Sequence, residues 1–188
     1  MRRGLVCVFL LTSSLAAVCA VPGPINAEET QPPVPIEYQV KAAFLYRFMH
    51  FVEWPEELAP KIEGAVIIGV IGNGPMHAAL VAITASSKYP QRLVIKRFDD
   101  PQDLEFCHML FISASAEGQS KAILKQLGDR GTLTVGEFDG FARQGGMINF
   151  IIVDKVVRFE INPDSAKRAN LKISSKLLRL AKIVNGGR

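Results

Sequence analysis

The feature that most constrains the fold is an apolar run, Ala65–Ile71, that leads directly into the turn sequence Gly72–Pro75. A continuous apolar run of this length is typical of a strand buried on both faces of a parallel sheet. Pro75 suits the first turn of a helix, and the apolar segment Ala78–Ile83 follows it. The segment therefore predicts a strand, a tight turn and a helix.

The same alternation of strands and helices recurs along the chain. Asp154-Lys155 is a two-residue turn between apolar runs and predicts an antiparallel hairpin. Strands separated by helices favour a parallel sheet with helices on both faces. We therefore expect a single three-layer α/β domain with a largely parallel central sheet flanked by helices, a C-terminal antiparallel hairpin and a terminal helix. The further strands are expected at Leu93–Phe98, Met109–Ile112, Thr132–Val135, Met147–Val153 and Val156–Ile161, and a helix at Ser120–Leu127.

The first expected helix is Glu37–Glu53, which Trp54-Pro55 ends because proline disfavours helical geometry in the residue before it. Its phenylalanines recur at helical spacing, which predicts contacts either on one side in the core or on two sides. Lys41 and Tyr46 are expected on the remaining surface.

The last expected helix is Leu171–Val184, with one apolar and one basic side. The basic side either faces solvent or contacts a partner. Arg158 and Glu160 alternate onto one face of the second hairpin strand and either pair with each other or border the same surface. The candidate partner-binding residues are therefore Arg158, Glu160, Lys172, Lys176 and Arg179.

The N-terminal sequence predicts three segments: a signal peptide at residues 1–27, an extended proline-rich lead-in at 28–35 and the α/β domain at 36–188. Arg2 and Arg3 precede the apolar stretch Leu5–Val18, which is too short to span a membrane. Cleavage is expected after Ala27, with Ala20 as the alternative. A lipid anchor at Cys19 is a weaker alternative, because the residue before Cys19 is not small. A retained membrane anchor is a further weak alternative.

Removal of this leader changes the cysteine and charge counts. Cys7 and Cys19 leave with it, so Cys107 is expected to be either buried and inert or paired between chains. The formal net charge of +4 falls by two with Arg2 and Arg3. The small basic excess that remains does not favour nucleic-acid binding.

No catalytic or metal-binding pattern emerges from the sequence. His50, His77 and His108 lack the spacing of metal ligands, and Cys107 and His108 point to opposite faces of a strand. Ser174 and Lys176 are two apart on an expected helix and do not face each other, so a helix cap at Ser174 or Ser175 is the better interpretation. We therefore expect no enzyme activity, no catalytic residue, no metal and no cofactor.

A small-ligand pocket is the alternative to a partner surface. Gly72-x-Gly74 after a strand is similar to a dinucleotide-binding loop, but His77 replaces the third glycine, so a tight turn is the better interpretation. Open α/β sheets bind ligands at the carboxyl ends of their strands. The candidate pocket residues are Gly72, Asn73, Gly74, His77, Ser113 and Ser115.

Three ordered blocks, Val40–Pro55, Gly145–Phe150 and Ile173–Ala181, resemble the YfiR-like family of periplasmic proteins. The resemblance spans about Ile36 to Val184. It implies an α/β domain in the bacterial periplasm that often dimerises. Its best-understood member represses a membrane-bound diguanylate cyclase by holding the periplasmic sensor region, and release raises cyclic-di-GMP and promotes biofilm. Related domains are joined to signalling kinases.

This resemblance implies a non-enzymatic periplasmic regulator. The expected partner is the periplasmic region of an inner-membrane diguanylate cyclase or sensor kinase, and the expected state is a homodimer that does not insert into the membrane. The alternative is a small-ligand sensor module acting with a kinase or other receptor. Some members use paired cysteines for redox control, which the single Cys107 of the mature chain does not allow.

Overall fold

The computed structural model describes residues 33–59, 64–86 and 92–186 of the 188-residue chain. The expected signal peptide and the lead-in up to residue 32 lie outside this part. No helix among the described residues is long and apolar enough to cross a bilayer.

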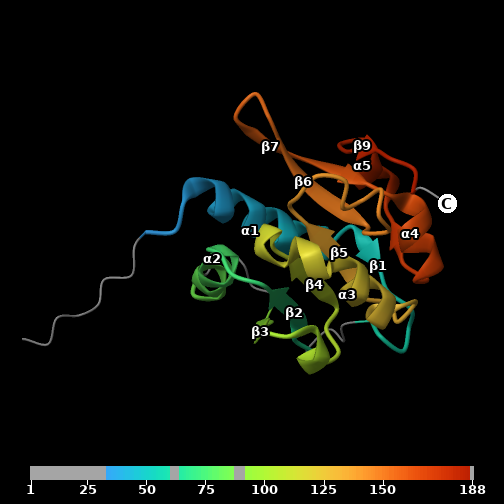
Figure 1. Cartoon of the computed structure of the whole chain (residues 1–188), viewed down its shortest axis with the longest axis horizontal. Coiled ribbons are helices and arrows are strands. Elements are labelled where there is room, and N and C mark those ends of the chain that lie inside the picture. The colour runs from blue at the N-terminus through green and yellow to red at the C-terminus, as the bar shows by residue number, and fades with distance from the viewer. Residues whose placement is uncertain (1–32, 60–63, 87–91, 187–188) are drawn as a thin grey trace, which may run out of the picture. The chain divides into compact units, whose positions relative to one another are not determined.

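A seven-stranded sheet forms the centre of the fold, in the order β3-β2-β4-β5-β6-β7-β9 (Figure 1). The five strands from β3 to β6 in this order are parallel to their neighbours, β7 is antiparallel to β6, and β9 is parallel to β7. The expected parallel sheet with a C-terminal hairpin is therefore confirmed. The strands are β2 (Val66–Ile71), β3 (Leu93–Phe98), β4 (Met109–Ile112), β5 (Leu133–Gly136), β6 (Ile148–Val153), β7 (Val156–Ile161) and β9 (Lys182–Ile183).

Helices and loops cover both faces of this sheet, which confirms the three layers. The helices α1 (Ile36–Phe48) and α2 (Met76–Thr84) pack on one face. The other face is covered by α3 (Ser120–Leu127), the 3-10 segment η2 (Ala114–Gln119) and the loop after β5. That loop buries Phe138 and Phe141, as expected. A further 3-10 turn, η1 (Pro101–Asp103), follows β3.

The first helix is shorter than predicted. It ends at Phe48, and Val52–Glu53 form a short strand, β1, that pairs antiparallel with β8 (Lys172–Ile173). Lys41 and Tyr46 are 4% and 6% exposed, so their expected place on the surface is wrong. The reason is that α1 contacts the sheet, α2 and the loop after β5, which leaves little of the helix free.

The predicted terminal helix is also interrupted. Its residues form β8, the four-residue helix α5 (Ser175–Leu178) and β9. Ser174 caps α5 by accepting a hydrogen bond from the Leu177 N–H at 3.3 Å, as the sequence indicated. Strand pairing of β8 with β1 and of β9 with β7 replaces helical hydrogen bonds on both sides of α5. Leu180, expected on the buried side, is 71% exposed.

A second short helix, α4 (Pro163–Arg168), follows β7. At its start, the Asn162 side chain accepts a hydrogen bond from the Ser165 N–H at 3.1 Å, and Pro163 is the first helical residue. Asn162 also donates to the Ala142 carbonyl at 2.7 Å, so this cap ties α4 to the loop after β5.

His108, just before β4, connects three segments. Its ring Nδ1 accepts a hydrogen bond from the Ile67 N–H at 3.0 Å, and its carbonyl accepts one from the Trp54 indole at 3.3 Å. Burial lowers the pKa of His108, although a hydrogen bond to the Leu58 backbone opposes this shift. The unfolded chain therefore takes up a proton at a higher pH than the folded chain, and acid should destabilise the fold through this ring.

We predict that His108→Asn reduces the loss of stability on acidification from pH 7 to pH 5. The Asn amide oxygen can still accept from Ile67, but it does not titrate. Urea unfolding at a series of pH values measures this dependence, with the exposed His50→Asn as the matched control. An equal pH dependence in His108→Asn and the wild type would contradict the assignment.

Candidate functional site

The predicted pocket residues lie where the winding of the sheet reverses. β3 lies on one side of β2 and β4 on the other, and Ile71 and Ile112 are register partners at the carboxyl ends. Gly72 and Ser113 directly follow these partners. Such a reversal opens a crevice in which α/β proteins bind ligands. The structure thus brings the two predicted segments together.

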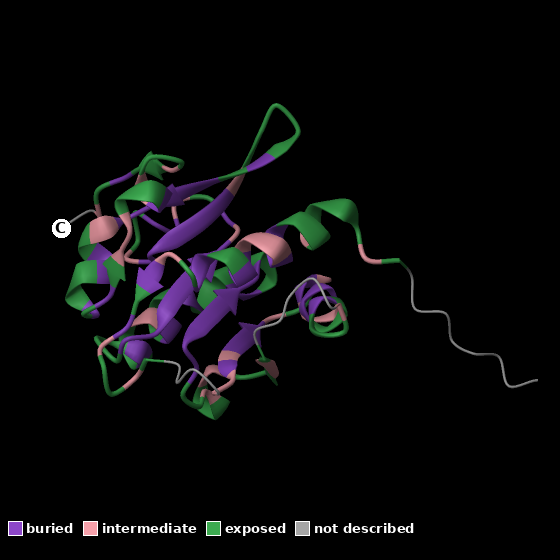
Figure 2. Cartoon of the chain, turned by 180° about the vertical axis from the view of Figure 1, so that it is seen from behind, coloured by how far each residue is buried: buried purple, intermediate pink, exposed green. Residues whose placement is uncertain are grey.

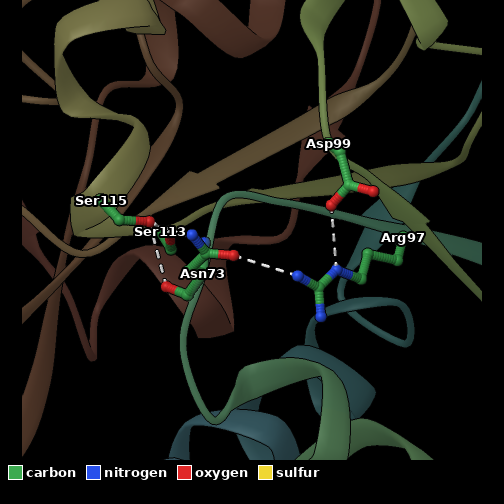
Figure 3. A network of polar contacts seen from close by, with 5 residues as sticks. All are labelled: Asn73, Arg97, Asp99, Ser113 and Ser115. Carbon is green, nitrogen blue, oxygen red and sulfur yellow. Dashed lines mark hydrogen bonds and ion pairs between the residues drawn. The ribbon is translucent and has the colours of Figure 1, made fainter.

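Backbone and side-chain groups of this cluster hydrogen-bond to one another (Figure 3). The Asn73 N–H donates to the Ser115 hydroxyl at 2.7 Å, and that hydroxyl lies 2.7 Å from the Ser113 hydroxyl. Arg97, from the end of β3, donates to the Asn73 side-chain oxygen at 3.0 Å and to the Asp99 carboxylate at 3.2 Å. Arg97 and Asp99 are members that the sequence reasoning did not select.

The cluster is closed around Gly72 and open around Gly74. Gly72 has a φ of +91°, and a Cβ there would lie 2.3 Å from the Ser113 hydroxyl. A Cβ on Gly74 would meet no atom within 4 Å. His77 is half-buried in the first turn of α2 and takes no part in these hydrogen bonds. A ligand here would therefore lie outside Gly74, against Asn73 and Arg97.

A buried ion pair that the sequence did not suggest lies at the same edge of the sheet. Glu137, directly after β5, accepts a hydrogen bond from Lys41 of α1 at 2.7 Å, and these side chains are 4% and 5% exposed. The Glu137 carboxylate also accepts from the Tyr38 hydroxyl at 3.3 Å and from the Ala114 N–H at 3.4 Å. One carboxylate thus joins α1, the end of β5 and the start of η2.

The environment of this pair keeps Lys41 charged. Burial lowers the pKa of Lys41, but hydrogen bonds to Glu137 and Glu37 and their charges outweigh it and raise the pKa above its ordinary value. Burial and the nearby Glu137 raise the pKa of Tyr38. The group therefore holds a fixed lysine cation, a carboxylate and a neutral phenol, an arrangement suited to positioning α1.

The predicted partner-binding residues fall into two groups. Lys172, Lys176 and Arg179 are all exposed on the segment from β8 to the end of α5. Arg158 is exposed on the separate hairpin strand β7. Glu160 is 5% exposed and accepts a hydrogen bond from Lys182 of β9 at 2.8 Å, so its carboxylate is engaged within the sheet.

A groove of about 720 Å³ lies beside the first group. Lys172 borders it and lies 3.9 Å from Glu53 of the paired strand β1. Trp54 forms part of its wall and is 9% exposed. Local sequence patterns could not predict this groove, because its walls come from segments more than a hundred residues apart. Its lining residues are Glu53, Trp54, Pro55, Glu56, Pro163, Lys167, Asn170, Leu171, Lys172 and Ile173.

Cys107 is a free, fully buried thiol, as the first of the two expectations for it states. Burial raises its pKa to about 11, so it is protonated and unreactive at neutral pH. Among the described residues, no group of three His, Cys, Asp or Glu side chains is placed to hold a metal ion.

We predict that Lys41→Met destabilises the fold by about 3 kcal/mol, because it leaves the Glu137 carboxylate buried without its cation. The double variant Lys41→Met/Glu137→Gln should recover part of this loss, since the uncompensated charge is then gone. Urea unfolding of both variants measures the difference. If Glu137→Gln lowered the stability of Lys41→Met as much as it lowers that of the wild type, the two side chains would act independently. That result would contradict the pairing.

Comparisons with known structures support the fold. An ABC domain from Streptococcus pneumoniae, solved in complex with L-Trp, superposes with a TM-score of 0.54 at 8% identity, over 79% of this chain and 60% of that one. A conserved domain protein from Vibrio cholerae superposes with a TM-score of 0.51 at 11% identity, over 78% of this chain and 59% of that one. The chain thus spans about three-fifths of each of these proteins.

The sequence comparison identifies the family. Residues 38–182 match the family described as YfiR/HmsC-like. The match runs from α1 to β9 and includes the groove beside Lys172 and the Lys41–Glu137 pair. The chain therefore belongs to the YfiR/HmsC-like family.

Proposed function

We propose that the chain is a non-enzymatic periplasmic regulator that binds and represses the periplasmic sensor region of a membrane signalling protein, most directly a diguanylate cyclase. Membership of the YfiR/HmsC-like family carries this proposal. The N-terminal sequence pattern of residues 1–27 supports export. We propose that the chain acts as a homodimer. Repression of the cyclase would lower cyclic-di-GMP and thereby limit biofilm formation.

The proposed mechanism is a population shift. A repressor can hold its partner inactive only by binding the inactive state more tightly than the active one. The groove beside Trp54 is an apolar recess lined by charges of both signs, and the exposed Lys176 and Arg179 follow Lys172 along the chain and add positive charge on that segment. Such a surface suits a partner segment that inserts an apolar side chain into the recess and places carboxylates toward Lys172, Lys176 and Arg179.

We predict that Lys176→Glu/Arg179→Glu weakens partner binding about tenfold or more, because reversed charges repel the carboxylates that the wild type attracts. Both residues are exposed, so the fold should be unaffected. The matched control, Lys121→Glu/Lys125→Glu, reverses two exposed charges on α3, away from this groove.

Intracellular cyclic-di-GMP, measured by mass spectrometry in a deletion strain of the source bacterium, reads out this prediction. Deletion should raise the nucleotide, and the wild type and the control should lower it again, while Lys176→Glu/Arg179→Glu should not. An unchanged level on deletion would contradict the regulatory proposal. Full repression by the reversed variant would contradict the surface alone.

A small-ligand sensor is the second candidate, and the cluster at the sheet reversal favours it. Arg97 is half-exposed there beside Asn73, and the space outside Gly74 is open. An acidic or polar metabolite could accept hydrogen bonds from the Arg97 guanidinium.

We predict that a cognate ligand at a hundred times its Kd raises the melting temperature by about 5–10 °C. A thermal-shift screen against metabolites and nucleotides at micromolar concentrations tests this, with Arg97→Gln as the variant that should lose the shift. A shift that persists in Arg97→Gln would place the ligand elsewhere.

A further inference from the structure

The hairpin of β6 and β7 extends beyond its neighbours in the sheet (Figure 1). The two strands pair with each other along all six residues. β5 pairs only with the first two residues of β6, and β9 only with the last two of β7. The outer part of the hairpin, residues 150–159, is therefore unpaired on both edges within the described structure, and we refer to it as the arm.

Exposed residues lie at the outer end of the arm and at the start of α1 (Figure 2), and several of them are apolar. Ile152, Val153 and Val156 are 51%, 45% and 48% exposed, and Ile36 and Val40 of α1 are 77% and 38% exposed. An exposed apolar strand edge is a template for pairing with another chain, and proteins normally cover or blunt it.

A groove of about 670 Å³ separates the arm from α1. Its floor and walls include Phe44 of α1 and Val157 of β7. Its two sides carry opposite charges. Glu37 on the helix pairs with Lys41 at 2.6 Å but keeps a side chain that is 44% exposed, and Lys155 and Arg158 lie on the arm. Neither Lys155 nor Arg158 has an ion-pair partner among the described residues.

We propose that this face binds a second copy of the chain. A two-fold axis beside the arm would bring the same face of the second copy against this one. The arm of each copy then lies in the groove of the other. Lys155 and Arg158 of one copy approach Glu37 of the other, and the exposed valines and isoleucines become buried.

The charges favour a second copy over a different partner. An acidic segment would match Lys155 and Arg158 but would face Glu37, and a basic segment would have the reverse problem. A copy related by a two-fold axis places its own Lys155 and Arg158 toward Glu37, and its own Glu37 toward Lys155 and Arg158. A two-fold contact of this face with itself also closes the assembly at two chains, because each copy uses both its arm and its groove in that contact.

This inference rests on the dimeric state in the proposed function and assigns its interface. We expect the protein purified from periplasmic extract to sediment at twice the chain mass at about 50 μM. Ile152→Asp and Val156→Asp should each shift it to the monomer, because a carboxylate would be buried in the interface. Leu180→Asp, at an exposed apolar position outside this face, should remain dimeric.

The outcomes separate the two proposals. A monomeric wild type at 50 μM would overturn the dimer itself, whereas a dimer that persists in both arm variants would overturn only the interface. Thermal unfolding of the variants establishes that they are folded, since both substitutions lie at exposed positions.

A cysteine cross-link provides a second test that does not depend on loss of binding. In the chain purified from the periplasm, which is expected to keep Cys107 alone, Val156→Cys in the exposed arm should form a disulfide-linked dimer under mild oxidation. Cys107 is fully buried and should not interfere. Leu180→Cys is the control that should stay monomeric on a non-reducing gel. Equal cross-linking at both positions would overturn the interface.

Discussion

The packing of α1 against the hairpin is the interaction on which the arrangement of this fold depends. Phe150 and Phe159 are a cross-strand pair, and Phe48 of α1 lies against both, with ring centroids 5.9 and 5.2 Å away. Phe44 adds an edge contact to Phe159 at 5.5 Å. Aromatic pairs contribute about 0.5–1.5 kcal/mol each beyond the area they bury. They fix the helix so that Lys41 reaches Glu137 and the first turns of α1 run alongside the arm.

The sequence predicted the central strands well because their signals are local. Leu93–Phe98 and Met109–Ile112 have the predicted bounds, since each is a short apolar run between polar or turn residues. The C-terminal segment was misjudged because its apolar spacing fits a helix, whereas its structure is decided by distant strands. Lys172–Ile173 pairs with β1, more than a hundred residues earlier, and nothing in the local sequence reveals that partner.

The same distinction explains which parts of the candidate site were predictable. The proximity of Gly72 and Ser113 could be predicted from a general rule, because the carboxyl ends of adjacent parallel strands meet at one edge of the sheet. The Lys41–Glu137 pair was missed because its members are 96 residues apart. A lysine on an amphipathic helix is normally exposed, and only the burial of α1 on several sides makes this one an exception.

The groove beside Trp54 and the groove at the arm have no lining residue in common, and α1 leads from one toward the other. Its first turns border the groove at the arm, and the chain after its last turn enters β1, which borders the groove beside Trp54. A dimer formed through the arms would therefore leave the groove beside Trp54 free in both copies. A partner that is itself two-fold symmetric would then be held at two points, and the second contact would form at a high effective concentration. Tight repression would follow from two modest surfaces without requiring either groove to be large.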